Sequence, residues 1–281
     1  MISEFMGIEY GHGACAVPPT GISPANAPDA VMAMFPDKKW TIVKPNQPFD
    51  MAACMSDRFA ENAPVQQMIY ENTPTARHIM IGGDHSVNFG HFAALADRMP
   101  DTDLCMVYVD AHFDIHNPES SRAQATGSPH GCNVRGLMGD GDERWMKLVK
   151  HQPSLRPENM FYIGVRSFEP AEQEFVRDNN IFVRYAEQLQ TPNSIQTTVR
   201  HVRQMLANRP FVLSFDFDGI DPKYFADVLV PENGGITLDA AKYIVESFSN
   251  AFGIEFVEYA PNGDAQSADI VRELVTIAMN G

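Results

Sequence analysis

The chain has 281 residues, of which 44% are hydrophobic and 20% charged, a composition typical of a globular protein that can bury a core. Its formal net charge of −15 argues against nucleic acid as a partner, because phosphate binding requires a basic surface. No apolar run is long enough to cross a bilayer and the N-terminus lacks the basic start of a signal peptide, so we expect a cytoplasmic protein without a membrane partner.

Short apolar runs alternate with helix-like stretches along the chain, which is the pattern of βαβ units. The predicted strands cover residues 41–43, 78–82, 104–109, 160–164, 181–185, 211–215 and 254–258. The predicted helices cover residues 51–70, 86–98, 144–150, 170–179, 194–207 and 238–252. We find no repeat and no linker, so the sequence predicts a single domain over residues 1–281. Its expected fold is α/β, a three-layer α/β/α sandwich with a mostly parallel central sheet.

Four predicted strands finish in side chains that bind metals or protons, at the end of a run with little charge. These side chains are His85, Asp110, His112, Asp114, Asp216, Asp218 and Glu258. Ligands of open α/β sheets collect outside the carboxyl ends of the strands, near a topological switch point. Such groups are costly to bury unpaired. The pattern therefore predicts one shared site rather than four unrelated strand ends.

Six of these residues, all except Glu258, are candidate metal ligands: four carboxylates and two imidazoles, with no thiolate. Carboxylates with one imidazole per ion suit Mn²⁺ or a similar metal, and six ligands fit a pair of ions better than one. The alternative is that Asp216 and Asp218 merely end a strand. For Asp221, which precedes Pro222, we favour such a structural role in a turn.

Three segments together resemble the ureohydrolase family, which includes arginases, agmatinases and formiminoglutamases. They are Gly82-Gly-Asp-His-Ser86, Asp110-Ala-His-Phe-Asp114 and Ser214-Phe-Asp-Phe-Asp-Gly-Ile-Asp-Pro222. Their order and approximate spacing match as well, and the resemblance covers most of the chain from about residue 79 to residue 260. It weakens over the first 75 residues. The resemblance implies an arginase-like fold and a centre of two Mn²⁺ ions.

The positions that match the family's metal ligands form two groups, which would share two bridging carboxylates. The first ion would be held by His85, Asp110, Asp114 and Asp216, and the second by His112, Asp110, Asp216 and Asp218. The resemblance also implies that His130, Asp114 and Glu258 are catalytic. His130 would shuttle protons, and Glu258 would pair with the substrate's guanidinium group.

Several residues depart from arginases where those enzymes contact the α-groups of arginine. His116 stands where arginases carry Asn, Thr126 stands for Ser, and Ser167 and Glu169 stand for two Asp residues. We therefore predict that His116 and Glu169 bind substrate together with Glu258. For His116, a loop-capping role is an equal alternative. These departures favour agmatine or another guanidino substrate narrowly over arginine.

The sequence thus predicts a hydrolase that cleaves a guanidino C–N bond of a small cationic guanidino or amidine substrate and releases urea and an amine. Arginase or formiminoglutamase activity is the near alternative. A binuclear metallophosphatase is disfavoured, because that family's Gly-Asn-His-Glu and Gly-His-x-His elements are missing. A non-catalytic partner protein of the same fold is the alternative of another class. The resemblance also implies a homo-oligomer, a trimer or a hexamer.

Overall fold

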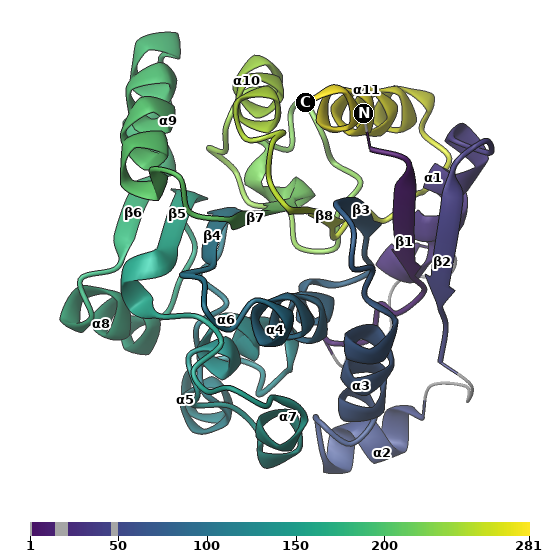
Figure 1. Cartoon of the computed structure of the whole chain (residues 1–281), viewed down its shortest axis with the longest axis vertical. Coiled ribbons are helices and arrows are strands. Elements are labelled where there is room, and N and C mark those ends of the chain that lie inside the picture. The colour runs from purple at the N-terminus through teal and green to yellow at the C-terminus, as the bar shows by residue number, and fades with distance from the viewer. Residues whose placement is uncertain (1, 15–21, 46–49) are drawn as a thin grey trace.

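The structure is a computed structural model that describes residues 2–14, 22–45 and 50–281. Eight parallel strands form one sheet in the order β2-β1-β3-β8-β7-β4-β5-β6 (Figure 1). Their bounds are Glu4–Ile8 (β1), Lys39–Val43 (β2), His78–Ile81 (β3), Cys105–Val109 (β4), Met160–Val165 (β5), Phe182–Tyr185 (β6), Phe211–Asp216 (β7) and Gly253–Val257 (β8).

Helices cover both faces of the sheet, which makes the three-layer α/β/α sandwich that the sequence predicts. One face carries α1 (Ala27–Met34), α9 (Pro192–Leu206), α10 (Leu238–Ser247) and α11 (Ala265–Asn280). The other face carries α3 (Asn62–Asn72), α4 (Asn88–Arg98), α6 (Asn133–Leu137) and α8 (Pro170–Asp178). The short helices α2 (Met51–Ser56), α5 (Pro118–Gln124) and α7 (Glu143–Leu148) lie on this second side (Figure 1).

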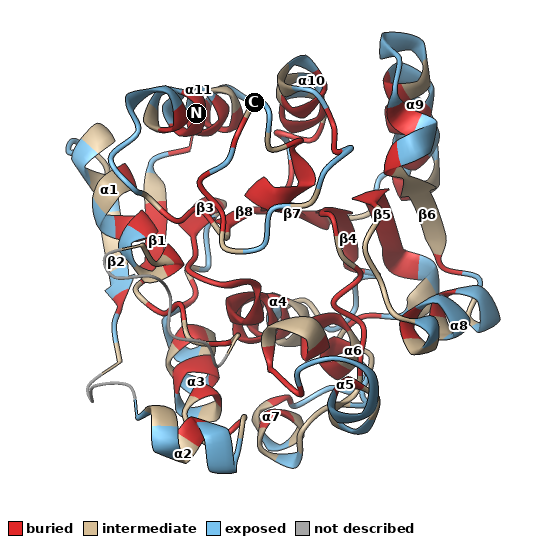
Figure 2. Ribbon diagram, turned by 180° about the vertical axis from the view of Figure 1, so that it is seen from behind, coloured by how far each residue is buried: buried red, intermediate tan, exposed pale blue. Residues whose placement is uncertain are grey.

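Strand β4 shows why the sheet is buried between two layers. Its side chains alternate, so that Cys105, Val107 and Val109 join the core under α9, α10 and α11. Met106 and Tyr108 join the core under α4 and α6. Both sets are fully buried. The strands β3, β4, β5, β7 and β8 are buried throughout, whereas the edge strand β6 is only partly buried and is drawn tan in Figure 2. A strand covered on both faces needs a continuous apolar run, and this run is what identifies it in the sequence.

The structure differs from the predicted elements in three places. Strand β1 was not predicted, because Gly7 interrupts its short apolar run and weakens the strand pattern. Helices α1, α5, α6 and α11 were also missed. The single helix predicted over residues 51–70 is two helices, α2 and α3. Pro64 explains this break, since proline in a helix interior removes a backbone hydrogen bond and clashes with the preceding turn.

The strand order places the candidate residues together. The strands β3, β8, β7 and β4 are adjacent in the middle of the sheet, and all point the same way. Consecutive strands β3 and β4 are separated by β8 and β7, so the chain changes direction across the sheet at this point. Among the described residues, no helix has the length and apolar character to cross a membrane.

Candidate metal centre

His85 lies in the short 3₁₀ helix η2 (His85–Val87) that follows β3, and its imidazole is buried. The Nδ1 atom of His85 faces three carboxylates. It lies 2.9 Å from Asp110 Oδ2, 3.0 Å from Asp216 Oδ2 and 3.4 Å from Asp114 Oδ2. The opposite ring nitrogen, Nε2, lies 2.9 Å from the hydroxyl of Ser214. The ring is therefore oriented with one nitrogen toward the acidic cluster.

His112 repeats this arrangement on the neighbouring side of Asp110. Its Nδ1 atom lies 3.1 Å from Asp218 Oδ2 and 3.4 Å from Asp110 Oδ1. His112 is less enclosed than His85, with 25% of its side chain exposed against 1%. The described residues form three groups whose potential ligand atoms lie within 4.8 Å of one another. One is His116 with Glu169 and Glu172, and the other two are His85 with Asp110 and Asp114, and His112 with Asp110 and Asp218. Asp110 belongs to both the His85 group and the His112 group.

Three of the carboxylates use one oxygen to hold the loop and leave the other free for the site. Asp110 Oδ1 accepts from the His112 N–H at 2.6 Å, and Asp216 Oδ1 accepts from the Asp218 N–H at 2.7 Å. Asp218 Oδ1 accepts from the N–H of Ala111 at 3.1 Å. Asp110 Oδ2 is fully buried and, although it lies 2.9 Å from His85 Nδ1, accepts no well-aligned hydrogen bond among the described residues. Because such an atom is costly to bury, it fits a cation between Asp110 and His85.

The electrostatics of the cluster point the same way. Burial and the charges of Asp218 and Asp110 raise the pKa of Asp216 well above its ordinary value. Burial and Asp110 raise the pKa of Asp114 to about 6. Burial opposes a charge on His85, yet Asp110 and Asp216 outweigh it and raise the pKa of His85 well above its usual value. The carboxylates thus attract positive charge, which a divalent cation supplies without protons.

Asp114 is held in place by two side chains that the sequence did not single out. The Tyr108 hydroxyl donates to Asp114 Oδ2 at 2.9 Å, and the amide of Asn133 donates to the same oxygen at 3.2 Å. The Tyr108 ring stacks on His85, with ring centroids 4.4 Å apart. Asp114 itself adopts a φ of 51°, a left-handed conformation that few residues other than glycine occupy. Tyr108 looks in the sequence like one more buried strand residue, which is why it was missed.

Glu258 follows β8 directly and also has a left-handed backbone, with a φ of 63°. Its Oε1 atom accepts from the backbone N–H of His85 at 2.9 Å, and its own N–H donates to the carbonyl of Gly83 at 2.8 Å. Gly83 must be glycine, because a Cβ there would lie 1.5 Å from the carbonyl oxygen of Tyr10. Glu258 is thus fixed to the same turn that carries His85.

His130 begins the 3₁₀ helix η3 (His130–Cys132), and the segment after β1 holds it in place. Its backbone N–H donates to the carbonyl of Gly13 at 3.3 Å, while the Gly13 N–H donates to Asp84 beside His85 at 2.8 Å. The Nδ1 atom of His130 is buried without a hydrogen-bond partner in the described part of the chain. His130 is also close enough to Asp114 for its charge to favour the ionised carboxylate.

His116 and Glu169 lie together beside this centre. The Nε2 atom of His116 lies 3.2 Å from Glu169 Oε2, and Nδ1 lies 3.0 Å from the Ser120 hydroxyl. Glu172, which the sequence prediction missed, completes the cluster at 3.7 Å from His116 Nε2. Burial and Glu169 raise the pKa of Glu172 to about 9. Its position three residues after Glu169, at a helix start with a proline, is a capping-box signal that identifies it in retrospect.

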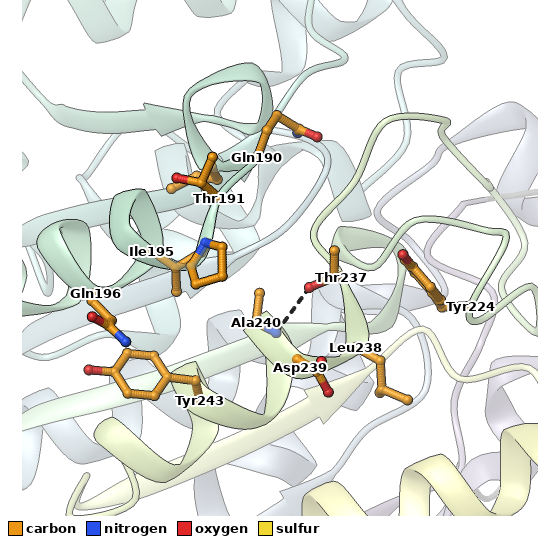
Figure 3. Close-up of a pocket in the computed structure, with 12 residues that line it drawn as sticks. Gln190, Thr191, Ile195, Gln196, Tyr224, Thr237, Leu238, Asp239, Ala240 and Tyr243 are labelled. Carbon is orange, nitrogen blue, oxygen red and sulfur yellow. Dashed lines mark hydrogen bonds between the residues drawn. The ribbon is translucent and has the colours of Figure 1, made fainter.

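A separate groove lies between the starts of α9 and α10 (Figure 3). Thr237 caps α10 there by accepting from the Ala240 N–H at 3.2 Å. Leu189, Ile195 and Tyr243 give the groove an apolar lining, and Asp239 is its one charged residue in the described part of the chain. It contains none of the predicted site residues; the predicted metal ligands and Glu258 gather instead just after the ends of β3, β4, β7 and β8.

The chain is similar in sequence to known arginases. It is 32% identical to an arginase of Eremothecium gossypii over 74% of this chain and 54% of that protein. It is also 32% identical to an arginase of Saccharomyces cerevisiae, over 66% of this chain and 57% of that protein. The chain therefore spans little more than half the length of these curated relatives.

Solved structures share its fold. An arginase of Entamoeba histolytica in complex with L-ornithine matches with a TM-score of 0.83 at 21% identity, over 100% of this chain and 99% of that one. A formimidoylglutamase of Bacillus subtilis matches with a TM-score of 0.75 at 15% identity, over 100% of this chain and 87% of that one. The model of the arginase family matches residues 36–280. The chain belongs to the arginase family.

Proposed function

We propose that this protein is a binuclear, manganese-dependent hydrolase that cleaves a guanidino C–N bond and releases urea and an amine. The observation that carries the proposal is the pair of imidazole–carboxylate groups that share Asp110, together with the buried Asp110 Oδ2, which faces His85 Nδ1 at 2.9 Å and accepts no well-aligned hydrogen bond among the described residues. The donor set is two imidazoles and four carboxylates, which suits Mn²⁺. The arginase family membership supports the same reaction class.

The residues fit the two ions in the following way. We propose that His85, Asp110, Asp114 and Asp216 hold one ion and that His112, Asp110, Asp216 and Asp218 hold the other. When bound, two such ions lower the pKa of a water molecule and stabilise the negative charge that develops as it attacks the guanidino carbon. The protein's part is to orient the ligands, which the backbone N–H bonds to Asp110, Asp216 and Asp218 achieve.

Three residues would handle the substrate and its protons. Glu258 presents a carboxylate beside His85, where it is suited to accept two N–H bonds from a guanidinium group. His130, whose Nδ1 atom makes no other bond in the described part of the chain, would donate a proton to the leaving amine. Asp114 would act both as a ligand and in orienting the nucleophile.

Two observations bear on the substrate. The relatives named above are arginases, which supports arginine as the substrate better than agmatine. His116, however, is engaged by Glu169 and Ser120, so no free amide or cation lies at the position where arginases carry Asn. We propose that the guanidino end of the substrate is bound as in arginases and that an α-carboxylate contributes less to binding.

Of the remaining properties, the assembly rests on the family resemblance, while the single domain and the location rest on the sequence. We propose that the chain forms one domain, that it assembles into a homo-oligomer, a trimer or a hexamer, and that it works in the cytoplasm on a small cationic substrate. The continuous eight-stranded sheet supports the single domain. Sedimentation of the Mn²⁺-loaded protein measures the assembly.

A urea-release screen tests the proposed reaction. Mn²⁺-loaded protein is assayed against arginine, agmatine, guanidinobutyrate and guanidinopropionate, with Asp110→Ala as the inactive control. Formiminoglutamate is assayed in parallel for formamide and ammonia. We expect urea from at least one guanidino substrate. No urea from any of them would contradict the proposal, and formamide from formiminoglutamate alone would establish the alternative activity.

A further inference from the structure

We infer that Glu232 is a positioning residue for His112: its carboxylate lies behind the imidazole and, with a cation in front, completes a carboxylate–histidine–cation series. The inference rests on the proposed metal centre. Glu232 lies in the loop between β7 and α10, outside every motif that identified the site in the sequence. Only the folded chain brings Glu232 close to His112.

The imidazoles of His85 and His112 have the same orientation. In both, Nδ1 faces the acidic cluster, so Nε2 points away from it. The outer nitrogen of His85 has the Ser214 hydroxyl as its partner at 2.9 Å. The outer nitrogen of His112 lies 3.9 Å from Glu232 Oε1. Histidines that bind metals regularly have such an outer partner, which fixes the ring and makes the ligand nitrogen more basic.

The loop that carries Glu232 is fastened to the metal centre. The Arg166 guanidinium donates at 2.7 Å to the carbonyl of Glu232 and at 2.7 Å to the carbonyl of Asp218, one of the ligands. Its Nε atom donates to the carbonyl of Asn233 at 3.1 Å. The half-buried guanidinium of Arg166 thus joins the backbone of the ligand loop to the backbone of the Glu232 loop.

The Glu232 side chain is aimed as well. The hydroxyl of Ser167 donates to Glu232 Oε1 at 3.1 Å, and this is the same oxygen that faces His112. On the far side of the loop, Asp221 accepts from the N–H groups of Gly234 and Lys223, each at 3.0 Å, which confirms the structural role expected for Asp221. Ser167 thus fixes the Glu232 carboxylate near His112, while Arg166 and Asp221 fix the backbone of the loop that carries it.

A bound cation strengthens this contact. It withdraws electrons from the imidazole through Nδ1, so the N–H at Nε2 becomes a better donor to a nearby carboxylate. The 3.9 Å separation is an ion-pair distance, and a shift of about 1 Å or a bridging water makes it a hydrogen bond. Loss of such an outer partner typically weakens metal affinity by about 10- to 100-fold.

The test is a Mn²⁺ titration of metal-free protein that resolves the two dissociation constants. We expect Glu232→Gln, which keeps the shape and removes the charge, to raise one constant about 10- to 100-fold and leave the other within about twofold. Glu232→Asp restores part of the affinity. Asp239→Asn removes an exposed carboxylate of the groove in Figure 3 and serves as the charge-matched control. In a His112→Ala background, Glu232→Gln has no further effect.

Three results overturn the inference. The first is that both constants in Glu232→Gln stay within twofold of the wild type. The second is that both weaken equally, which indicates a general charge effect. The third is an unchanged metal affinity with a raised KM, which makes Glu232 a substrate contact. Wild-type protein that binds no Mn²⁺ contradicts the proposed function itself, so the two failures are distinguishable.

Discussion

Two buried clusters of histidine and carboxylate lie at opposite ends of β3 and differ in how their polar groups are satisfied. His78, the first residue of β3, donates from Nδ1 to the carbonyl of Ala76 at 2.8 Å. Its Nε2 atom therefore accepts from Nε2 of His91 at 2.7 Å, and Nδ1 of His91 meets the carboxylate of Glu255. Each ring nitrogen of this cluster has a partner supplied by the protein.

His85, just past the other end of β3, is equally buried, yet its Nδ1 atom faces three carboxylates and Asp110 Oδ2 is left without a hydrogen bond. The pKa values of the two histidines are also shifted in opposite directions. Burial and His91 lower the pKa of His78 to about 3, whereas Asp110 and Asp216 overcome burial and raise the pKa of His85. A cluster in which every ring nitrogen is paired within the protein supports the fold, whereas a cluster that gathers three carboxylates around one imidazole nitrogen is a candidate cation site.

The largest effect is expected at the carboxylate that both ligand groups share. Asp110→Ala should bind neither Mn²⁺ ion and lose about a thousandfold or more in turnover, because the ions supply several kcal/mol of transition-state stabilisation. Elemental analysis and urea release measure both. Circular dichroism checks that the variant is folded. A variant with normal metal content would place the centre elsewhere.

A smaller loss is expected at His130, which lies beside Asp114 without belonging to either ligand group. His130→Ala should keep both ions and lower kcat about a hundredfold, since a positioned acid or base contributes at least that much. The measurement is kcat alongside metal content. Loss of metal in this variant would mean that His130 is a ligand.

A smaller effect is expected at His116, on the preference between arginine and agmatine. His116→Asn, which restores the arginase residue, should raise kcat/KM for arginine relative to agmatine by about tenfold, the effect of one hydrogen bond to a charged group. Steady-state kinetics on both substrates measure the ratio. An unchanged ratio would show that His116 only caps the loop through Ser120.

At the start of β3, substitution of His78 is expected to change the free energy of unfolding in a way that depends on pH. His78 is neutral in the folded chain down to about pH 3, while in the unfolded chain it gains a proton near 6.5. Between these values the unfolded state binds more protons, so stability falls as the pH is lowered. His78→Gln should reduce this fall by about 1 kcal/mol per pH unit, as urea unfolding at pH 6 and pH 5 measures. Turnover at pH 8 should stay at the wild-type value.

The sequence predicted seven of the eight strands and the meeting of their ends, because buried parallel strands are continuous apolar runs and their carboxyl ends share one edge. The six candidate ligands come together in the structure for this reason. Each lies within a few residues of a strand end, so a local pattern was enough to find it.

The supporting residues could not be found in this way. Tyr108 lies inside an apolar strand, and only the fold brings its hydroxyl to Asp114. Glu232 reaches His112 through a loop whose path depends on Arg166, 66 positions earlier in the chain. Contacts of this kind depend on long-range packing, and neither periodicity nor spacing records them.

The most direct test is the number of Mn²⁺ ions that the chain binds, measured by equilibrium dialysis of metal-free protein followed by elemental analysis. Two ligand groups that share Asp110 predict two ions per chain in the wild type and none in Asp110→Ala. Wild-type protein that binds one ion or none would contradict a binuclear centre at the ends of β3, β4, β7 and β8.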